Sequence, residues 1–262
     1  MYLRSSITNY YKMNFQRIKY LTIIACFIAL FSSCLKQGNP IVVPDGVISF
    51  GTMTDQQGNE YNSVTIGKQT WMAQNLRTSV YNDNTPITKI TDTTTWQNTN
   101  SGAMCSYKNI SNSDTIKKFG LLYNWYTVKT NKICPVQWHV PTHSEWDTLL
   151  VYLAAHKYSY YGYGLGIAKS LADTDGWKMN QYEGTVGFIQ LRNNSSGFKA
   201  VPAGNRNKNG KFDFAGSYTT WWSSTEKSAD SAYARGLNYS DSHIIIGYDH
   251  ERSGFSIRCI KD

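Results

Sequence analysis

The sequence lacks a long hydrophobic run, and it carries little charge. Asp, Glu, Lys and Arg together make up 17% of the 262 residues. The longest nearly uninterrupted apolar run, residues 20–31, is shorter than the roughly 20 residues that a membrane-spanning helix needs. After residue 33 the basic residues are scattered, with Lys117-Lys118 the only adjacent pair, whereas nucleic-acid binding needs a clustered basic surface. We therefore expect no nucleic-acid partner.

Recognisable catalytic motifs are missing as well. The chain has no Gly-x-Ser-x-Gly elbow, no phosphate-binding glycine loop and no His-Glu-x-x-His helix. Asp213 and Glu226 are a conceivable glycosidase pair, but any two acids in a chain of this length are conceivable in the same way. We expect no enzymatic activity, no catalytic residue and no cofactor.

Metal-binding patterns are weak. Four metal-capable side chains fall within nine residues, but zinc needs at least three converging ligands and Glu145 is better explained as a helix cap. A calcium site needs six or more oxygen ligands, and no dense run of acidic residues supplies them. We expect no metal site. The candidates weighed were His139, His143, Glu145 and Asp147 for zinc, and Asp241, Asp249 and Glu251 for calcium.

Residues 1–33 have the pattern of a lipoprotein-type signal peptide. Basic residues precede the apolar run 20–31, and Ser32-Ser33 stand directly before Cys34. We expect Cys34 to become the acylated N-terminus, because a multiply acylated cysteine anchors a protein without a transmembrane helix. The alternatives are a plain cleaved signal or an uncleaved anchor. The predicted location is the outer membrane, facing either the periplasm or the cell surface.

The remaining 229 of the 262 residues are enough for one large domain. Residues 34–46 contain two prolines and no periodicity, so we interpret them as the tether that follows the lipid. Residues 47–262 form the predicted domain. Because residues 1–33 hold four basic and no acidic residues, their removal lowers the formal net charge from +8 to +4.

Three cysteines remain in the predicted domain, so at most one disulfide can form within it. We predict that Cys134 pairs with Cys259, which would link the segment before a helix to the last strand. This pairing closes a loop of about 125 residues and stabilises the fold by roughly 4–5 kcal/mol in the loop-entropy model. Cys105–Cys259 is the alternative.

Strand and helix patterns follow one another in an order that favours an α+β fold. Thr142 and Glu145 form a capping box, and four apolar residues at helical spacing follow it, so a helix is predicted up to Ala155. A first helix is expected at Phe119–Lys129 and a single helical turn at 167–171. Residues 77–118 and 173–196 are expected to be irregular. Strands are expected at 47–53, 60–66, 68–76, 197–201, 220–224, 231–237, 244–248 and 255–260.

Aromatic residues in the loops are the best candidates for ligand contacts. Tyr160, Tyr161 and Tyr163 stand among glycines, where an exposed ring offers a stacking surface for sugars or peptide side chains. Trp177 is a second candidate. Trp221 and Trp222 alternate across a predicted strand, so one of them, taken as Trp222, should be exposed. The competing interpretation is that the loop rings fold back into a small core. Three arginines are expected to be structural hydrogen-bond centres: Arg206, Arg235 and Arg258.

Several phrases in one order resemble the Fibrobacter succinogenes major paralogous domain family. They are IGKQTWMAQNL (66–76), FGLLYNWYTV (119–128), CPVQWHVPTHSEWDTL (134–149), SGFKAVPAGNRNKNGKF (196–212), WWSSTE (221–226), ARGLNYS (234–240) and GFSIRCIKD (254–262). The resemblance runs from about Ile48 to the C-terminus and implies a secreted or lipid-anchored protein of Bacteroidota or Fibrobacter-type bacteria. It implies no activity.

This family is distantly similar to C-type-lectin-like folds, including the formylglycine-generating enzymes. The similarity implies a single domain with paired terminal strands, two helices and a long loop region that binds ligand. The oxidase chemistry of those enzymes depends on two cysteines in the C-terminal half, and the C-terminal half of the predicted domain 47–262 has Cys259 alone. We therefore expect a lipid-anchored, non-catalytic recognition module for glycan or protein ligands. The alternatives are a polysaccharide-active enzyme and a purely structural envelope component.

Overall fold

The computed structural model describes residues 45–46 and 48–262, which belong to one compact unit, Val42–Asp262. The predicted signal peptide, Cys34 and nearly all of the predicted tether lie outside the described residues. No helix within the described part of the chain is long and apolar enough to cross a membrane.

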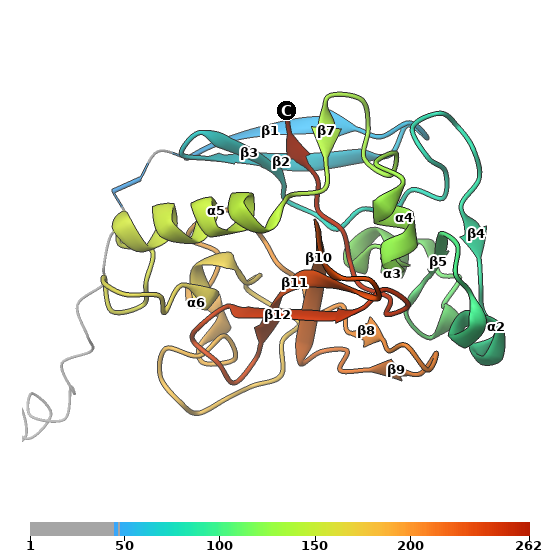
Figure 1. The fold of residues 1–262 in the computed structure, drawn as a ribbon. Helices are drawn as coiled ribbons and strands as arrows, with labels where there is room; N and C mark the ends of the chain where they lie inside the picture. Colours follow the sequence, from blue (N-terminus) through green and yellow to red (C-terminus); the bar gives the residue numbers. More distant parts are fainter. Residues whose placement is uncertain (1–44, 47) are drawn as a thin grey trace, which may run out of the picture. The chain divides into compact units, whose positions relative to one another are not determined.

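The fold is α+β, with several small sheets (Figure 1). The largest sheet has the order β1-β2-β3-β13-β7, and its strands are β1 (Ile48–Thr54), β2 (Glu60–Ile66), β3 (Gln69–Met72), β13 (Ile260–Lys261) and β7 (Trp138–His139). The second sheet consists of β10 (Tyr218–Ser228), β11 (Ser231–Asn238) and β12 (Ile245–His250). The smaller sheets contain β4 (Thr88–Lys89), β5 (Ala103–Cys105) and β6 (Leu122–Tyr123), and β8 (Asn205–Arg206) with β9 (Phe212–Asp213).

The helices are short apart from one. They are α2 (Thr93–Asn98), α3 (Ser113–Phe119), α4 (Trp125–Lys129), α5 (His143–Ala155) and α6 (Ala168–Leu171), with 3₁₀ turns η1 (Tyr107–Asn109) and η2 (Gln190–Arg192). Helices α2 and α3 lie in the stretch that was expected to be irregular. Each begins at a side-chain cap, Asp92 and Asn112, which is a local signal that the sequence analysis did not use.

The C-terminal strand completes the sheet that the N-terminal strands begin. Strand β13 lies between β3 and β7, with Ile260 opposite both Trp71 and His139. The terminal strands therefore share a sheet, although β13 pairs with β3 rather than with β1. Gly67, at a φ of 61°, makes the tight turn that brings β3 back along β2.

Helix α5 lies between the two larger sheets (Figure 1). Its capping box is present as predicted, with Thr142 accepting from the amide of Glu145 and Glu145 accepting from the amide of Thr142. The ring centroid of Trp146 lies 4.7 Å from that of Trp71 and 5.9 Å from that of Trp221. The buried face of α5 is thus the centre of the first hydrophobic core, and its members are the predicted Trp146, Leu149, Leu150 and Leu153.

A second core covers the opposite face of β10. Trp222 packs there on Phe255, with ring centroids 4.4 Å apart, while Trp221 faces the first core. Both tryptophans are fully buried, so the prediction that one of them is exposed is wrong. The reason is that Phe255, from a segment that pairs with β10 at Ser256, packs on Trp222 within the second core. The predicted Cys134–Cys259 disulfide is present in this core, and Cys105 is free and buried.

Three other predicted elements differ from the structure. The expected helix 119–129 is limited to α4, because Gly120 has a φ of 78° and Asn124 begins a new helix as its cap. The expected strands at 197–201 and 255–260 form only isolated bridges and the short β13. These segments are extended, but they pass between sheets instead of joining one.

The buried arginines bind the chain itself, as predicted. Arg258 donates to Asn75 Oδ1 at 3.1 Å and to the carbonyl of Lys199 at 2.8 Å, and burial lowers its pKa to about 9. Arg206 donates to carbonyls of residues 90–92 and lies over the rings of Trp96 and Phe212. Arg235 donates to Asp147 Oδ1 at 2.6 Å. Arg206 and Arg258 thus supply donors to backbone carbonyls, whereas Arg235 binds a carboxylate of α5.

Candidate functional site

The tyrosine-rich loop after α5 leaves two of its three predicted rings exposed. The side chain of Tyr161 is 46% exposed and that of Tyr163 is 77% exposed. Tyr160 is half-buried instead, because its hydroxyl donates to Glu183 Oε1 at 2.9 Å. Tyr161 and Tyr163 are therefore accessible to a ligand, whereas Tyr160 links the loop to Glu183.

The two predicted tryptophan contacts are wrong. Trp177 is only 4% exposed, and its indole N–H donates to the carbonyl of Ala200 at 3.2 Å. The indole N–H of Trp222 donates to the carbonyl of Tyr123 at 2.8 Å within the second core. Both indoles are buried and have their hydrogen-bond donors satisfied, so neither can stack on a ligand. Loop position and strand alternation did not reveal the segments that cover them.

A cavity of about 560 Å³ lies on the sheet β10-β11-β12, and we refer to it as the sheet cavity. Its floor consists of small residues that neighbouring strands place side by side: Ala234 is opposite Gly247, and Gly236 is opposite Thr220. A Cβ added at Gly247 would meet no atom within 4 Å. The floor is therefore open at Gly247, whereas the Tyr218 hydroxyl covers Gly236 and lies 2.8 Å from the position of an added Cβ.

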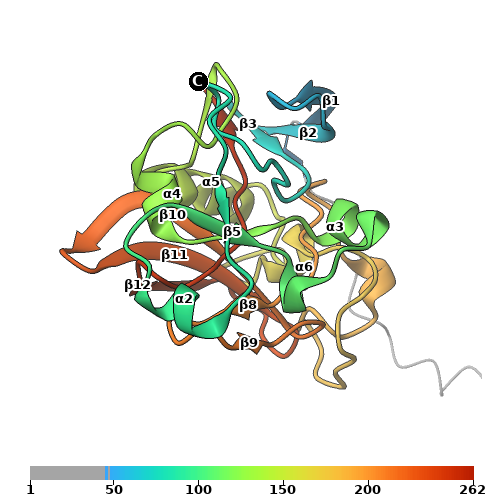
Figure 2. The ribbon, with the colours of Figure 1, turned by 90° about the vertical axis from the view of Figure 1, so that its right-hand side faces the viewer.

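Aromatic and polar side chains form the wall of the sheet cavity. Strand β8, which contacts β10 (Figure 2), contributes Asn205. The rings of Phe214 and Tyr218 lie 6.0 Å apart and are tilted by 55°. Burial raises the pKa of the Tyr218 phenol, and the Asp249 carboxylate adds to this rise, so the phenol is a neutral hydrogen-bond donor at neutral pH. The remaining aromatic residues of the wall are Tyr239, Tyr248 and Phe255.

Two acceptors of the wall are incompletely used. Asp249 Oδ1 accepts from the amide of His250 at 2.6 Å and from Ser253 Oγ at 2.9 Å, while no hydrogen bond within the described residues engages Oδ2. Asn205 Oδ1 is buried without a hydrogen-bond partner in the described part of the chain. Because buried polar atoms are normally paired, Asn205 Oδ1 marks a position for a donor of a ligand or of water. Asp249 is exposed, so its Oδ2 is open to water or to a ligand.

The sheet cavity was not among the sites predicted from the sequence. Asp249 was weighed only as a calcium ligand, and Tyr218 was not considered. A usable signal was the alternation of Ala232, Ala234 and Gly236 in β11, which puts three small residues on one face of a strand. That pattern predicts a depression, but it does not show which residues form the walls.

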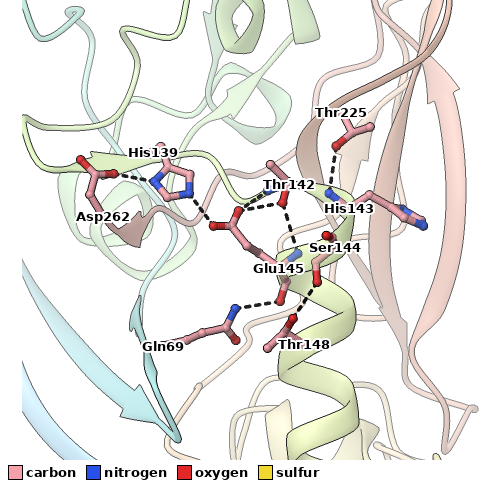
Figure 3. Close-up of polar contacts among 9 residues, drawn as sticks. All are labelled: Gln69, His139, Thr142, His143, Ser144, Glu145, Thr148, Thr225 and Asp262. Atoms are coloured by element: carbon pink, nitrogen blue, oxygen red, sulfur yellow. Dashed lines mark hydrogen bonds and ion pairs between the residues drawn. The ribbon is translucent and has the colours of Figure 1, made fainter.

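Two of the four candidate zinc ligands, His139 and Glu145, belong to a structural network instead (Figure 3), while His143 Nε2 lies 3.6 Å from Asp147 Oδ2. His139 lies between two carboxylates, with Nδ1 2.6 Å from Asp262 Oδ1 and Nε2 2.9 Å from Glu145 Oε1. Partial burial opposes the charged imidazolium, but these hydrogen bonds outweigh it and raise the pKa of His139. Partial burial likewise opposes the Glu145 carboxylate, but the Thr142 amide and His139 lower its pKa. The network joins the C-terminus to the start of α5.

The two acids considered as a glycosidase pair lie in different parts of the structure. Asp213 accepts from Asn207 between β8 and β9, whereas Glu226 lies 3.4 Å from Lys129 Nζ beside α4. In the part of the chain that the structure describes, no three His, Cys, Asp or Glu side chains are grouped so that they could hold a metal ion.

The order of motifs around these two sites matches a known family over most of the chain. The model of the Fibrobacter succinogenes major domain matches residues 64–261. The chain belongs to this family. The match includes the disulfide, α5 and every strand of the sheet cavity, so these features lie within the family domain. No curated protein and no solved structure matches the chain.

Proposed function

We propose that this chain is a lipid-anchored, non-catalytic protein of the outer membrane that recognises glycans. Acylation of Cys34 would attach it to the membrane, facing the periplasm or the cell surface. The folded domain would bind its ligand in the sheet cavity. The observation that carries the proposal is the combination of aromatic wall, open floor and unused acceptors in that cavity.

A sugar ligand needs both an aromatic surface and hydrogen-bond acceptors. Its C–H faces stack on aromatic rings, and its hydroxyls donate to carboxylate and amide oxygens. The Phe214 and Tyr218 rings supply the first surface, while Asp249 Oδ2 and Asn205 Oδ1 supply the second. The absence of a side chain at Gly247 leaves room for a ring to lie against the strands.

The small number of acidic residues at the sheet cavity favours a binding protein over a hydrolase. Most glycosidases use two carboxyl groups that flank the bond they cleave. Among the described residues that line the sheet cavity, Asp249 is the only acid. Asp230 lies with Asp249 on an adjoining depression, which makes hydrolysis the alternative that an assay must test.

The test is a glycan and peptidoglycan-fragment array probed with residues 35–262. For a ligand that binds, Asp249→Asn should weaken binding about tenfold, because a hydrogen bond to a charged group contributes roughly 1.5–3 kcal/mol. Tyr218→Phe should weaken it less, since the ring is kept. Asp114→Asn is the control, because Asp114 lies on α3 outside the cavity. Unchanged glycan binding by Asp249→Asn would refute the sheet cavity as the binding site. Release of a cleaved glycan would favour the alternative that the protein is an enzyme.

We further propose that the domain is C-type-lectin-like. The sharing of one sheet by β1–β3 and β13 supports this, as does the position of α4 and α5 ahead of a long irregular region. An experimental structure superposed on C-type lectins tests the proposal. A different strand order in the sheet that contains β1 and β13 would contradict it.

A further inference from the structure

Exposed hydrophobic side chains gather on two neighbouring loops, residues 158–166 and 178–192, which we call the paired loops. Among the described residues, 14 large hydrophobic side chains are exposed, and seven of them lie here. Exposed apolar groups of this kind mark protein or membrane contacts more often than chance. The seven are Tyr161, Tyr163, Leu165, Met179, Tyr182, Ile189 and Leu191.

The paired loops are held together by hydrogen bonds. Tyr160 of the first loop donates to Glu183 of the second at 2.9 Å. Lys169, a buried residue of α6, donates to the carbonyls of Thr185 and Phe188 in the second loop. A Cβ at Gly184 would lie 3.5 Å from the rings of both Tyr160 and Tyr161. The exposed side chains therefore belong to one constructed surface.

The start of the described chain is fixed beside this surface. The amide of Asp45 donates to the carbonyl of His156 at 3.3 Å, and the Asp45 carboxylate lies 2.8 Å from Lys157 Nζ. The first of the paired loops begins at the next residue, Tyr158. The segment that comes from Cys34 thus reaches the domain at the C-terminal end of α5, where the paired loops begin.

We propose that the paired loops are a membrane-contact surface that rests on the bilayer to which Cys34 is attached. This inference rests on the lipid anchor of the proposed function, but not on its glycan site. The 11 residues from Leu35 to Asp45 span at most about 40 Å. A short tether of this kind keeps a surface near its target at an effective concentration in the millimolar range, so weak insertion is enough.

The chemistry of the side chains favours a bilayer over a sugar. Tyrosine suits the membrane interface because its ring is apolar and its hydroxyl stays in water. Four of the seven side chains are aliphatic or methionine, and these insert among acyl chains but offer no flat face to a sugar ring: Leu165, Met179, Ile189 and Leu191. The sugar-stacking role expected for Tyr161 and Tyr163 is therefore the competing outcome.

The test attaches residues 35–262 to vesicles by an N-terminal hexahistidine tag. The vesicles contain phosphatidylethanolamine, phosphatidylglycerol and a nickel-chelating lipid, so the anchor does not depend on acylation of Cys34. A polarity-sensitive fluorophore is placed at Tyr163→Cys or Leu191→Cys. The native cysteines do not react, because Cys134 and Cys259 are bonded and burial raises the pKa of the Cys105 thiol to about 11.

Val136→Cys is the matched control. Val136 is 76% exposed but precedes β7, at the opposite end of α5 from the paired loops. We expect a blue shift at positions 163 and 191 on the vesicles, and quenching by nitroxide-labelled lipid, with no change at 136. Solution-like emission at 163 and 191, or an equal shift at 136, would overturn the proposal. So would a response at 163 to soluble glycans alone. Metabolic labelling with an acyl analogue tests the anchor at Cys34 separately.

Discussion

Replacing both Cys134 and Cys259 by alanine removes the covalent link between the segment before β7 and the last strand. The two cysteines are 125 residues apart. Without the disulfide, added conformational entropy stabilises the unfolded chain by about 5 kcal/mol at 25 °C. This is comparable to the whole stability of many domains. Cys134 and Cys259 are also buried in the second core, so the loss of packing adds to the effect.

Urea unfolding of the 35–262 chain measures the effect. A loss of about 5 kcal/mol lowers the midpoint by roughly 2 M for a domain of this size. Cys105→Ala is the control, because Cys105 is buried but unbonded and its replacement removes only one sulfur from the core. If the double variant unfolded within about 1 kcal/mol of the unchanged chain, the loop-entropy account would be wrong for this fold.

Two further results are expected from urea unfolding. Gly120→Ala should destabilise the domain by about 3 kcal/mol or more, because φ is 78° and the new Cβ would lie 2.5 Å from Asn75 Cβ. Gly58→Ala, at a φ of 77° and with no atom within 4 Å of the new Cβ, should cost only about 1 kcal/mol. Equal losses of stability in the two glycine variants would contradict the predicted clash with Asn75. Because the pKa of His139 is raised in the fold, its contribution is complete below its ordinary pKa and is lost as pH rises through the raised value. His139→Gln should thus cost more at pH 5.5 than at pH 8.5, by less than about 1 kcal/mol at this partly exposed site, and a pH-independent cost would refute this.

The sequence predicted the elements whose signals are local. The capping box at Thr142 and Glu145 predicts the start of α5, because the atoms involved are within one helical turn. The hairpin of β1 and β2 follows from alternating residues on both sides of a turn. The family could likewise be predicted, since motif order is a property of the chain itself. The three cysteines limited the domain to one disulfide, whereas the fold decided for Cys134–Cys259 over the alternative Cys105–Cys259.

Only the tertiary structure decided which aromatic rings are available to a ligand. Trp177 and Trp222 became buried because segments distant in sequence cover them, and Phe255 is an example. The sheet cavity depends on how the side chains of β8 and of the sheet β10-β11-β12 pack against one another. Local periodicity reports which face of a strand a residue occupies. Whether that face is open depends on long-range packing, which no short stretch of sequence contains.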